Sequence, residues 1–164
     1  AAYMLGWHMI AFVIFIAASF TDMLDGKIAR KYNLVTNFGK IMDPLADKVL
    51  VYSAFCLLIP DYVPGWMLII ILAREFTVAG MRTVAASEGI VIAAAMSGKI
   101  KTVLQMIAVP MLLLLPVFQN SFDLPASLET AYYYLTYAFL WASLVMTVYS
   151  GAEYVIKNKE VFKQ

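Results

Sequence analysis

The sequence predicts an all-α membrane protein in which a bundle of helices crosses the bilayer several times. Hydrophobic residues make up 63% of the 164-residue chain, charged residues make up only 14%, and the mean hydropathy is +0.79. An ordinary soluble domain is far more polar than this. The apolar residues also gather into segments of about 20 residues, the length that a helix needs to cross the hydrocarbon core.

Five segments have this length, and we expect each of them to form one transmembrane helix. They run over residues 1–30, 40–60, 65–87, 98–118 and 127–157. Turn-forming residues such as Pro60, Gly65 and Gly89 separate some of them. No soluble domain, low-complexity tract or short repeat interrupts the pattern, so we expect a single domain over residues 1–164.

The positions of Lys and Arg predict how the helices are oriented. All twelve lie in three regions, namely 27–48, 74–101 and the residues after 156. Basic residues favour the cytoplasmic side of a membrane. This places 27–40, 88–98 and the C-terminus in the cytoplasm, and 60–65 and 119–127 outside. Residue 1 then starts on the outer side, so a protein that begins in the cytoplasm needs a sixth helix before it.

Composition also argues against some functions. The net charge is +1, which gives no reason to expect a nucleic-acid partner. The single cysteine, Cys56, lies in an apolar run. We expect it to be a buried, unreactive thiol, and it cannot form a disulfide within the chain.

Four carboxylates lie close together in the sequence where the first apolar segment ends and the second begins. They are Asp22, Asp25, Asp43 and Asp47. Asp22 and Asp25 are three residues apart, and Asp43 and Asp47 are four apart, so the members of each pair share one face of a helix. Clustered acids repel one another and normally persist where cations neutralise them. Carboxylate oxygens suit Mg²⁺ or Mn²⁺, and two divalent ions would balance four negative charges. Such ions commonly contact phosphates as well, so we expect a phosphate-bearing substrate.

Three small residues near the acids each allow two interpretations. Gly26 and Ala29 leave room against the helix for a bulky substrate group, or they permit close packing of another helix. Gly39 either lies beside the site or simply breaks a helix. Residue type alone does not separate these interpretations.

Charged residues also lie inside later apolar segments. Arg74 and Glu75 are in the middle of the third segment, where a charge is costly and suggests function. Pairing with charges on neighbouring helices explains Glu75 equally well. Arg82, Lys99 and Lys101 could instead extend to the cytoplasmic interface. Their convergence on the side that holds the acids favours an anion site.

The stretch from Asp22 to Asp47 resembles a known signature. It reads Asp-x₂-Asp-Gly-x₂-Ala-Arg-x₈-Gly-x₃-Asp-x₃-Asp and matches the motif of the CDP-alcohol phosphotransferase family without departure. The resemblance implies a six-helix membrane enzyme, usually a homodimer, that joins a CDP-linked group to an alcohol and releases CMP. It implies that Asp22, Asp25 and Asp43 bind metal, and that Asp47 is the general base and also touches the second metal. It implies a CDP site formed by Asp22, Asp25, Gly26, Ala29, Arg30 and Gly39.

Shorter matches narrow the resemblance to one group within the family. The stretches 42–48, 74–77 and 98–102 are similar to bacterial phosphatidylglycerophosphate synthases. These enzymes of phospholipid biosynthesis convert CDP-diacylglycerol and glycerol 3-phosphate to phosphatidylglycerophosphate and CMP. The resemblance implies a bacterial cell-membrane protein with its active site facing the cytoplasm. The candidates for binding the acceptor's phosphate are Arg74, Arg82, Lys99 and Lys101.

Other functions remain open at this stage. The acceptor could be inositol phosphate, serine or phosphatidylglycerol, although the basic residues favour an anionic acceptor. A cation transporter would also place carboxylates within the membrane. However, transporters often show paired repeats and broken helices near the midplane. Here no repeat is visible, and the acids cluster at one end of two neighbouring helices.

Overall fold

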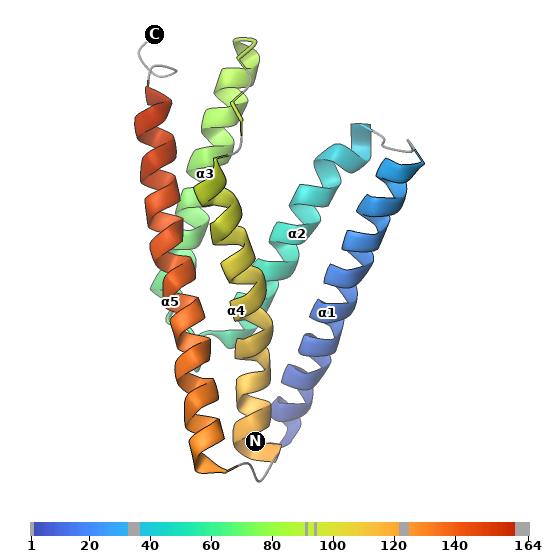
Figure 1. The fold of residues 1–164 in the computed structure, drawn as a ribbon, viewed down its shortest axis with the longest axis vertical. Helices are drawn as coiled ribbons and strands as arrows, with labels where there is room; N and C mark the ends of the chain where they lie inside the picture. The colour runs from blue at the N-terminus through green and yellow to red at the C-terminus, as the bar shows by residue number, and fades with distance from the viewer. Residues whose placement is uncertain (1, 33–36, 91, 94, 122–124, 160–164) are drawn as a thin grey trace.

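The computed structural model describes residues 2–32, 37–90, 92–93, 95–121 and 125–159, and within them the side chains other than those of 2–5, 23, 29–30, 37–44 and 120–121. These residues form five helices and no strand (Figure 1). The helices are α1 (Ala2–Lys31), α2 (Asn37–Leu58), α3 (Gly65–Ser87), α4 (Met96–Ser121) and α5 (Ala126–Lys157). The predicted all-α, polytopic bundle is therefore confirmed.

The helix boundaries follow the predicted ones closely, and the largest differences, of two or three residues at each end, are in α2 and α4. Helix α3 begins at Gly65 and ends at Ser87, as the turn residues around it indicate. Helix α4 runs from Met96 to Ser121, beyond the predicted 98–118, and it contains Pro110 and Pro116. Proline is tolerated within membrane helices, where neighbouring groups compensate for the lost backbone hydrogen bond.

Three of the described segments are long and apolar enough to cross a membrane: Gly6–Ile28, Met96–Gln119 and Ala126–Lys157. Helices α2 and α3 are 22 and 23 residues long. At about 1.5 Å per residue, helices of this size cover roughly the thickness of the hydrocarbon core. They also carry charged residues, including Lys48 on α2 and Glu75 on α3. Glu75 is buried, so α3 contributes a charge to the interior of the bundle.

The helices alternate in direction as the Lys and Arg pattern predicts. In Figure 1, α1, α3 and α5 all end near the top, where α2 and α4 begin. The start of α1 and the end of α4 lie at the bottom. We call the upper end, to which Lys27, Arg82, Lys99 and Lys157 belong, the basic end.

Two apolar clusters of unequal size hold the bundle together. The larger draws on all five helices and includes the fully buried residues Phe55, Leu58, Ile71, Leu112, Leu113 and Leu140. The smaller consists of Val78, Met81 and Tyr154 with Ile92 packed against it. Along α3, Glu75 lies between Ile71 of the larger cluster and Val78 of the smaller. A polar layer therefore separates the main core from the basic end.

The prediction that Cys56 is buried is wrong, because its side chain is exposed on α2. Lipid tails are as apolar as a protein core, so an apolar stretch in a membrane helix does not indicate which residues face the protein. Helix α1 shows the same effect, since Val13, Ile14 and Phe20 are each 57% exposed.

Candidate active site

The described acids of the signature lie on α1 and α2, which pack against each other. Asp22 and Gly26 are half-buried on α1, and Asp25 is exposed. Asp47 is half-buried on α2. The side chains of Ala29, Arg30, Gly39 and Asp43 lie outside the described residues.

Carboxylates make up the whole predicted metal-binding set, which is the ligand chemistry that Mg²⁺ prefers. Among the described side chains, however, no three Asp, Glu, His or Cys residues lie close enough to hold a metal ion. Asp22, Asp25 and Asp47 therefore do not complete a metal site by themselves. The fourth carboxylate, Asp43, belongs to the undescribed side chains, so the metal site stays a prediction.

Asp47 lines a cavity of about 210 Å³ between α2, α3 and α4. We call it the Asp47 cavity. Its other lining residues include Lys48 and Tyr52 from α2, Glu75 from α3, and Lys101 and Gln105 from α4. Lys101 and Gln105 are each 3% exposed, so the cavity places polar groups deep in the bundle. The predicted base and one predicted phosphate-binding lysine thus share one cavity.

A larger groove of about 820 Å³ carries the other predicted phosphate-binding residues. We call it the basic groove, and its lining includes Lys48, Arg74, Glu75, Arg82, Gly98, Lys99, Thr102 and Tyr154. Lys48, Glu75 and Thr102 also line the Asp47 cavity. The groove and the cavity are therefore neighbours with a shared wall.

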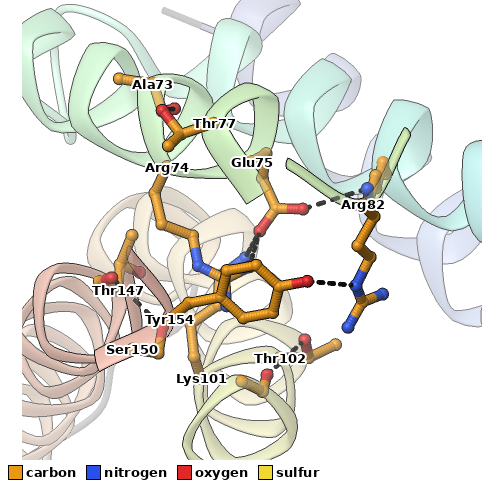
Figure 2. A network of polar contacts seen from close by, with 12 residues as sticks. Ala73, Arg74, Glu75, Thr77, Arg82, Lys101, Thr102, Thr147, Ser150 and Tyr154 are labelled. Atoms are coloured by element: carbon orange, nitrogen blue, oxygen red, sulfur yellow. Dashed lines mark hydrogen bonds and ion pairs between the residues drawn. The ribbon is translucent and has the colours of Figure 1, made fainter. Parts of the chain in front are cut away.

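Glu75 forms the centre of that shared wall. Its Oε1 lies 2.8 Å from Arg74 Nη1 and 2.5 Å from Lys101 Nζ, and its Oε2 lies 3.2 Å from Lys48 Nζ. Figure 2 shows the side chains of Arg74 and Lys101 reaching this carboxylate from α3 and α4. The sequence allowed Glu75 to pair with charges on neighbouring helices, and the structure shows this pairing with Lys48 and Lys101.

Arg82 is anchored at the edge of the basic groove by a tyrosine. Its Nε donates a hydrogen bond to the Tyr154 hydroxyl at 3.2 Å, and its guanidinium lies 5.6 Å from the centre of that ring (Figure 2). A hydrogen bond and a cation–π contact together restrict where an arginine can point. Tyr154 is 3% exposed, so the anchor is itself fixed by packing.

Comparison with known proteins shows the family of the chain that carries this site. Residues 1–149 match the CDP-alcohol phosphatidyltransferase family. The chain belongs to this family. It is therefore a membrane-embedded phosphatidyltransferase, and the resemblance drawn from the signature is confirmed.

Curated relatives of this phosphatidyltransferase have bacterial sources. The chain is 50% identical to the CDP-diacylglycerol–glycerol-3-phosphate 3-phosphatidyltransferase of Bacillus subtilis (strain 168), over 95% of this chain and 77% of the relative. It is 37% identical to the protein of the same name from Rickettsia bellii (strain RML369-C), over 94% and 82% respectively. It is 34% identical to a probable phosphatidylglycerophosphate synthase of Mycobacterium tuberculosis (strain ATCC 25618 / H37Rv), over 92% and 66%.

Sequence reasoning missed several polar residues that line the candidate site. Lys48, Gln105 and Tyr154 had no assigned role, yet each lines the Asp47 cavity or the basic groove. Both Lys48 and Gln105 carried a usable signal, because Lys48 directly follows Asp47 of the signature and Gln105 interrupts the apolar stretch of a predicted helix. Tyr154 carried none, since aromatic residues are common near both ends of membrane helices.

Proposed function

We propose that this phosphatidyltransferase transfers the phosphatidyl group of CDP-diacylglycerol to glycerol 3-phosphate, giving phosphatidylglycerophosphate and CMP. The names of the relatives suggest both substrates. The observation on this chain that carries the choice of acceptor is the basic groove. Its lining includes Arg74, Arg82 and Lys99, and it adjoins the Asp47 cavity.

A phosphate monoester suits the groove better than a neutral alcohol does. Arginine presents a planar fork of donors that matches phosphate oxygens, and lysine adds a compact positive charge. Buried or half-buried cations are costly in a membrane unless an anion meets them. Glu75 neutralises only part of the charge contributed by Lys48, Arg74 and Lys101. An anionic acceptor would supply more of the missing negative charge.

The donor would bind on the α1 and α2 side. We place the CDP group against Asp22, Asp25, Gly26, Ala29, Arg30 and Gly39, with two divalent metal ions, Mg²⁺ or Mn²⁺, held by Asp22, Asp25, Asp43 and Asp47. When bound, the ions would neutralise the pyrophosphate and the charge that develops on departing CMP. The all-carboxylate donor set supports this assignment.

Asp47 would be the general base of the transfer. Its carboxylate takes the proton of the acceptor hydroxyl, whose oxygen forms a bond to the β-phosphorus of CDP-diacylglycerol. The bond from that phosphorus to the bridging oxygen breaks, and CMP leaves with the electron pair. The position of Asp47 on a cavity that also holds Lys101 supports this role, because an acceptor bound by its phosphate can bring its hydroxyl to Asp47.

The surroundings of the reaction also belong to the proposal. We place the site toward the cytoplasm of a bacterial cell membrane, so that the acyl chains stay in lipid while the water-soluble acceptor enters from the basic end. We also expect a homodimer, as the family usually forms.

The test is CMP release by the detergent-solubilised protein with CDP-diacylglycerol, Mg²⁺ and a panel of acceptors. The proposal expects release with glycerol 3-phosphate and none after the metal is chelated. Release only with inositol phosphate, serine or phosphatidylglycerol would overturn the choice of acceptor. No release from folded protein with any acceptor would overturn the proposed reaction itself.

A further inference from the structure

Glu75 occupies a position on α3 that packing alone would give to an apolar residue. The buried residues of this helix are Met67, Leu68, Ile71, Glu75, Val78, Met81 and Ala85. They recur every three or four residues and form one stripe along the helix. A carboxylate within such a stripe is costly unless its charge is met by partners. Its presence therefore calls for an explanation beyond packing.

The partners of Glu75 come from three different helices. Lys48 is on α2, Arg74 on α3 and Lys101 on α4, and together they engage both carboxylate oxygens. One anion thus fixes three cations relative to one another at the wall shared by the Asp47 cavity and the basic groove. Figure 2 shows two of these partners, Arg74 and Lys101, at the Glu75 carboxylate.

Arg74 is held along its side chain as well as at its tip. A Cβ atom on Gly151 of α5 would lie 2.9 Å from Arg74 Cγ, and one on Gly98 of α4 would lie 3.1 Å from Arg74 Nη2. The two glycines therefore leave a slot through which the arginine passes. Arg74 Nε is buried and has no hydrogen-bond partner among the described residues. A buried N–H group without a partner suggests that a bound ligand supplies the oxygen that accepts its hydrogen bond.

We propose that Glu75 is a positioning residue for the acceptor's phosphate. Its carboxylate orients Arg74, Lys48 and Lys101 so that their remaining donors meet the phosphate, and Glu75 itself does not contact the substrate. Gly151 contributes by keeping the stem of Arg74 in place. The identity of the acceptor rests on the function proposed above.

The sign of the effect separates positioning from simple electrostatics. Glu75→Gln removes a negative charge beside an anion site, so a role through charge alone predicts tighter binding of the acceptor. A positioning role predicts weaker binding, because the cations lose the group that aligns them. A purely structural role predicts lower thermal stability and equal effects on both substrates.

The experiment compares the variants Glu75→Gln, Glu75→Asp and Gly151→Ala in the full chain. The control is Gly80→Ala on α3, where an added Cβ meets nothing within 4 Å. Steady-state CMP release gives kcat and the KM of each substrate. Titration calorimetry with glycerol 3-phosphate and with inorganic phosphate gives binding without turnover.

We expect Glu75→Gln and Gly151→Ala to raise the KM of glycerol 3-phosphate about tenfold, the loss typical of one misaligned charged hydrogen bond. The kcat and the KM of CDP-diacylglycerol should stay within about twofold of the wild type on the same reasoning. Glu75→Asp keeps the charge and should recover part of the loss. Gly80→Ala should match the wild type.

Several outcomes would overturn the proposal. Unchanged or tighter acceptor binding in Glu75→Gln would do so, as would an equal rise in both KM values. If Glu75→Gln does not fold, Gly151→Ala becomes the deciding variant. Equal KM values for glycerol 3-phosphate in Gly151→Ala and Gly80→Ala would then reject the positioning role.

The proposed function can fail separately. A wild type without turnover that binds inorganic phosphate, with weaker binding in Glu75→Gln, would refute the function and keep this inference. If the wild type turns over glycerol 3-phosphate and Glu75→Gln has the same kinetic constants, the proposed function stands and this inference is refuted. Absence of both turnover and phosphate binding in folded wild type would reject both.

Discussion

Asp47 and Glu75 are two carboxylates on one cavity, and their surroundings favour different roles. Glu75 is 8% exposed, and both of its oxygens are engaged by cations. Asp47 is half-buried and belongs to the acidic signature shared with α1. A carboxylate that anchors three cations is poorly suited to receive a proton from substrate, whereas Asp47 lies on the cavity that an acceptor hydroxyl would enter.

Asp47→Asn should therefore abolish most of the turnover while leaving the binding of CDP-diacylglycerol largely intact. The amide cannot take a proton, and loss of a general base typically lowers the rate by about 10²–10⁴-fold. The measurements are kcat from CMP release and the Kd of the CDP-lipid from calorimetry. The matched control is Asp61→Asn in the exposed α2–α3 connection at the opposite end, which should behave as the wild type. Turnover of Asp47→Asn near the wild-type rate would exclude the role.

The contact between Arg82 and Tyr154 gives a second prediction at this scale. Tyr154→Phe removes the hydroxyl that accepts from Arg82 Nε but keeps the buried ring. Loss of one such hydrogen bond, worth about 0.5–1.5 kcal/mol, should raise the KM of glycerol 3-phosphate about two- to tenfold with little change in kcat. Acceptor titrations at saturating CDP-diacylglycerol measure this.

Tyr149→Phe on the same helix is the control, because Tyr149 is 58% exposed. It should leave both kinetic constants unchanged. Equal KM values for Tyr154→Phe and Tyr149→Phe would show that Arg82 does not depend on this anchor to bind the acceptor.

At the scale of the element, α5 carries a row of small polar residues into the bundle. Thr136, Ser143, Thr147 and Ser150 are buried, and each hydroxyl donates to a carbonyl of its own helix. Their hydroxyls thus need no partner on a neighbouring helix. Small residues let membrane helices approach closely, and α5 packs along α4 more extensively than any other described pair does.

Size at these positions should therefore matter more than polarity. Ser143→Ala keeps a small side chain and should change the melting temperature in detergent by only about 1–2 °C, as for a locally satisfied hydroxyl. Ser143→Leu forces extra atoms into a packed interface, which typically costs about 1–3 kcal/mol of stability. It should therefore lower the melting temperature by several degrees. Ala142→Leu adds a similar side chain at an exposed position and should have little effect. A similar loss in Ser143→Leu and Ala142→Leu would show that the position is not packed tightly.

The comparison of sequence and structure is clearest for α3. Turn residues on both sides predict its ends, and costly charges predict that Arg74 and Glu75 do more than fill the membrane. The pairing of Glu75 with Lys101 was not predictable, because Lys101 lies on another helix and the contact depends on how α3 and α4 are rotated. The slot at Gly151 depends on the same packing. Asp22 and Asp47 lie on different helices, but they were recognisable because both belong to one continuous sequence signature, which does not depend on how the helices pack.

At the scale of the whole molecule, the placement of charge indicates how the bundle sits in the membrane. The ends of α1, α3 and α5 share one end of the bundle in Figure 1, while the α2–α3 connection lies away from it. The lining of the basic groove includes Arg82 near the end of α3 and Lys99 near the start of α4, which belong to the same end. Basic residues favour the cytoplasmic side. Under the proposed function, an acceptor that arrives from the cytoplasm can reach the groove only if the groove opens on that side, so orientation and function are linked.

Cysteine labelling in intact cells tests this orientation. In a Cys56→Ser background, Asp61→Cys should react with a membrane-impermeant maleimide added outside, and Glu88→Cys should react only after the membrane is permeabilised. Both positions are exposed, so access to the thiol depends on the side of the membrane and not on burial in the protein. Replacement of Cys56 is needed because it is the only cysteine in the chain and is exposed on α2.

The control is labelling in detergent, where both introduced cysteines should react to the same extent. If Glu88→Cys labels from outside while Asp61→Cys does not, the bundle is inverted. The basic groove would then open away from the cytoplasm, and a cytoplasmic acceptor could not reach Arg74 or Lys99 without crossing the membrane. An inverted pattern would thus contradict the proposed route of glycerol 3-phosphate while leaving the family and the geometry of the site unchanged.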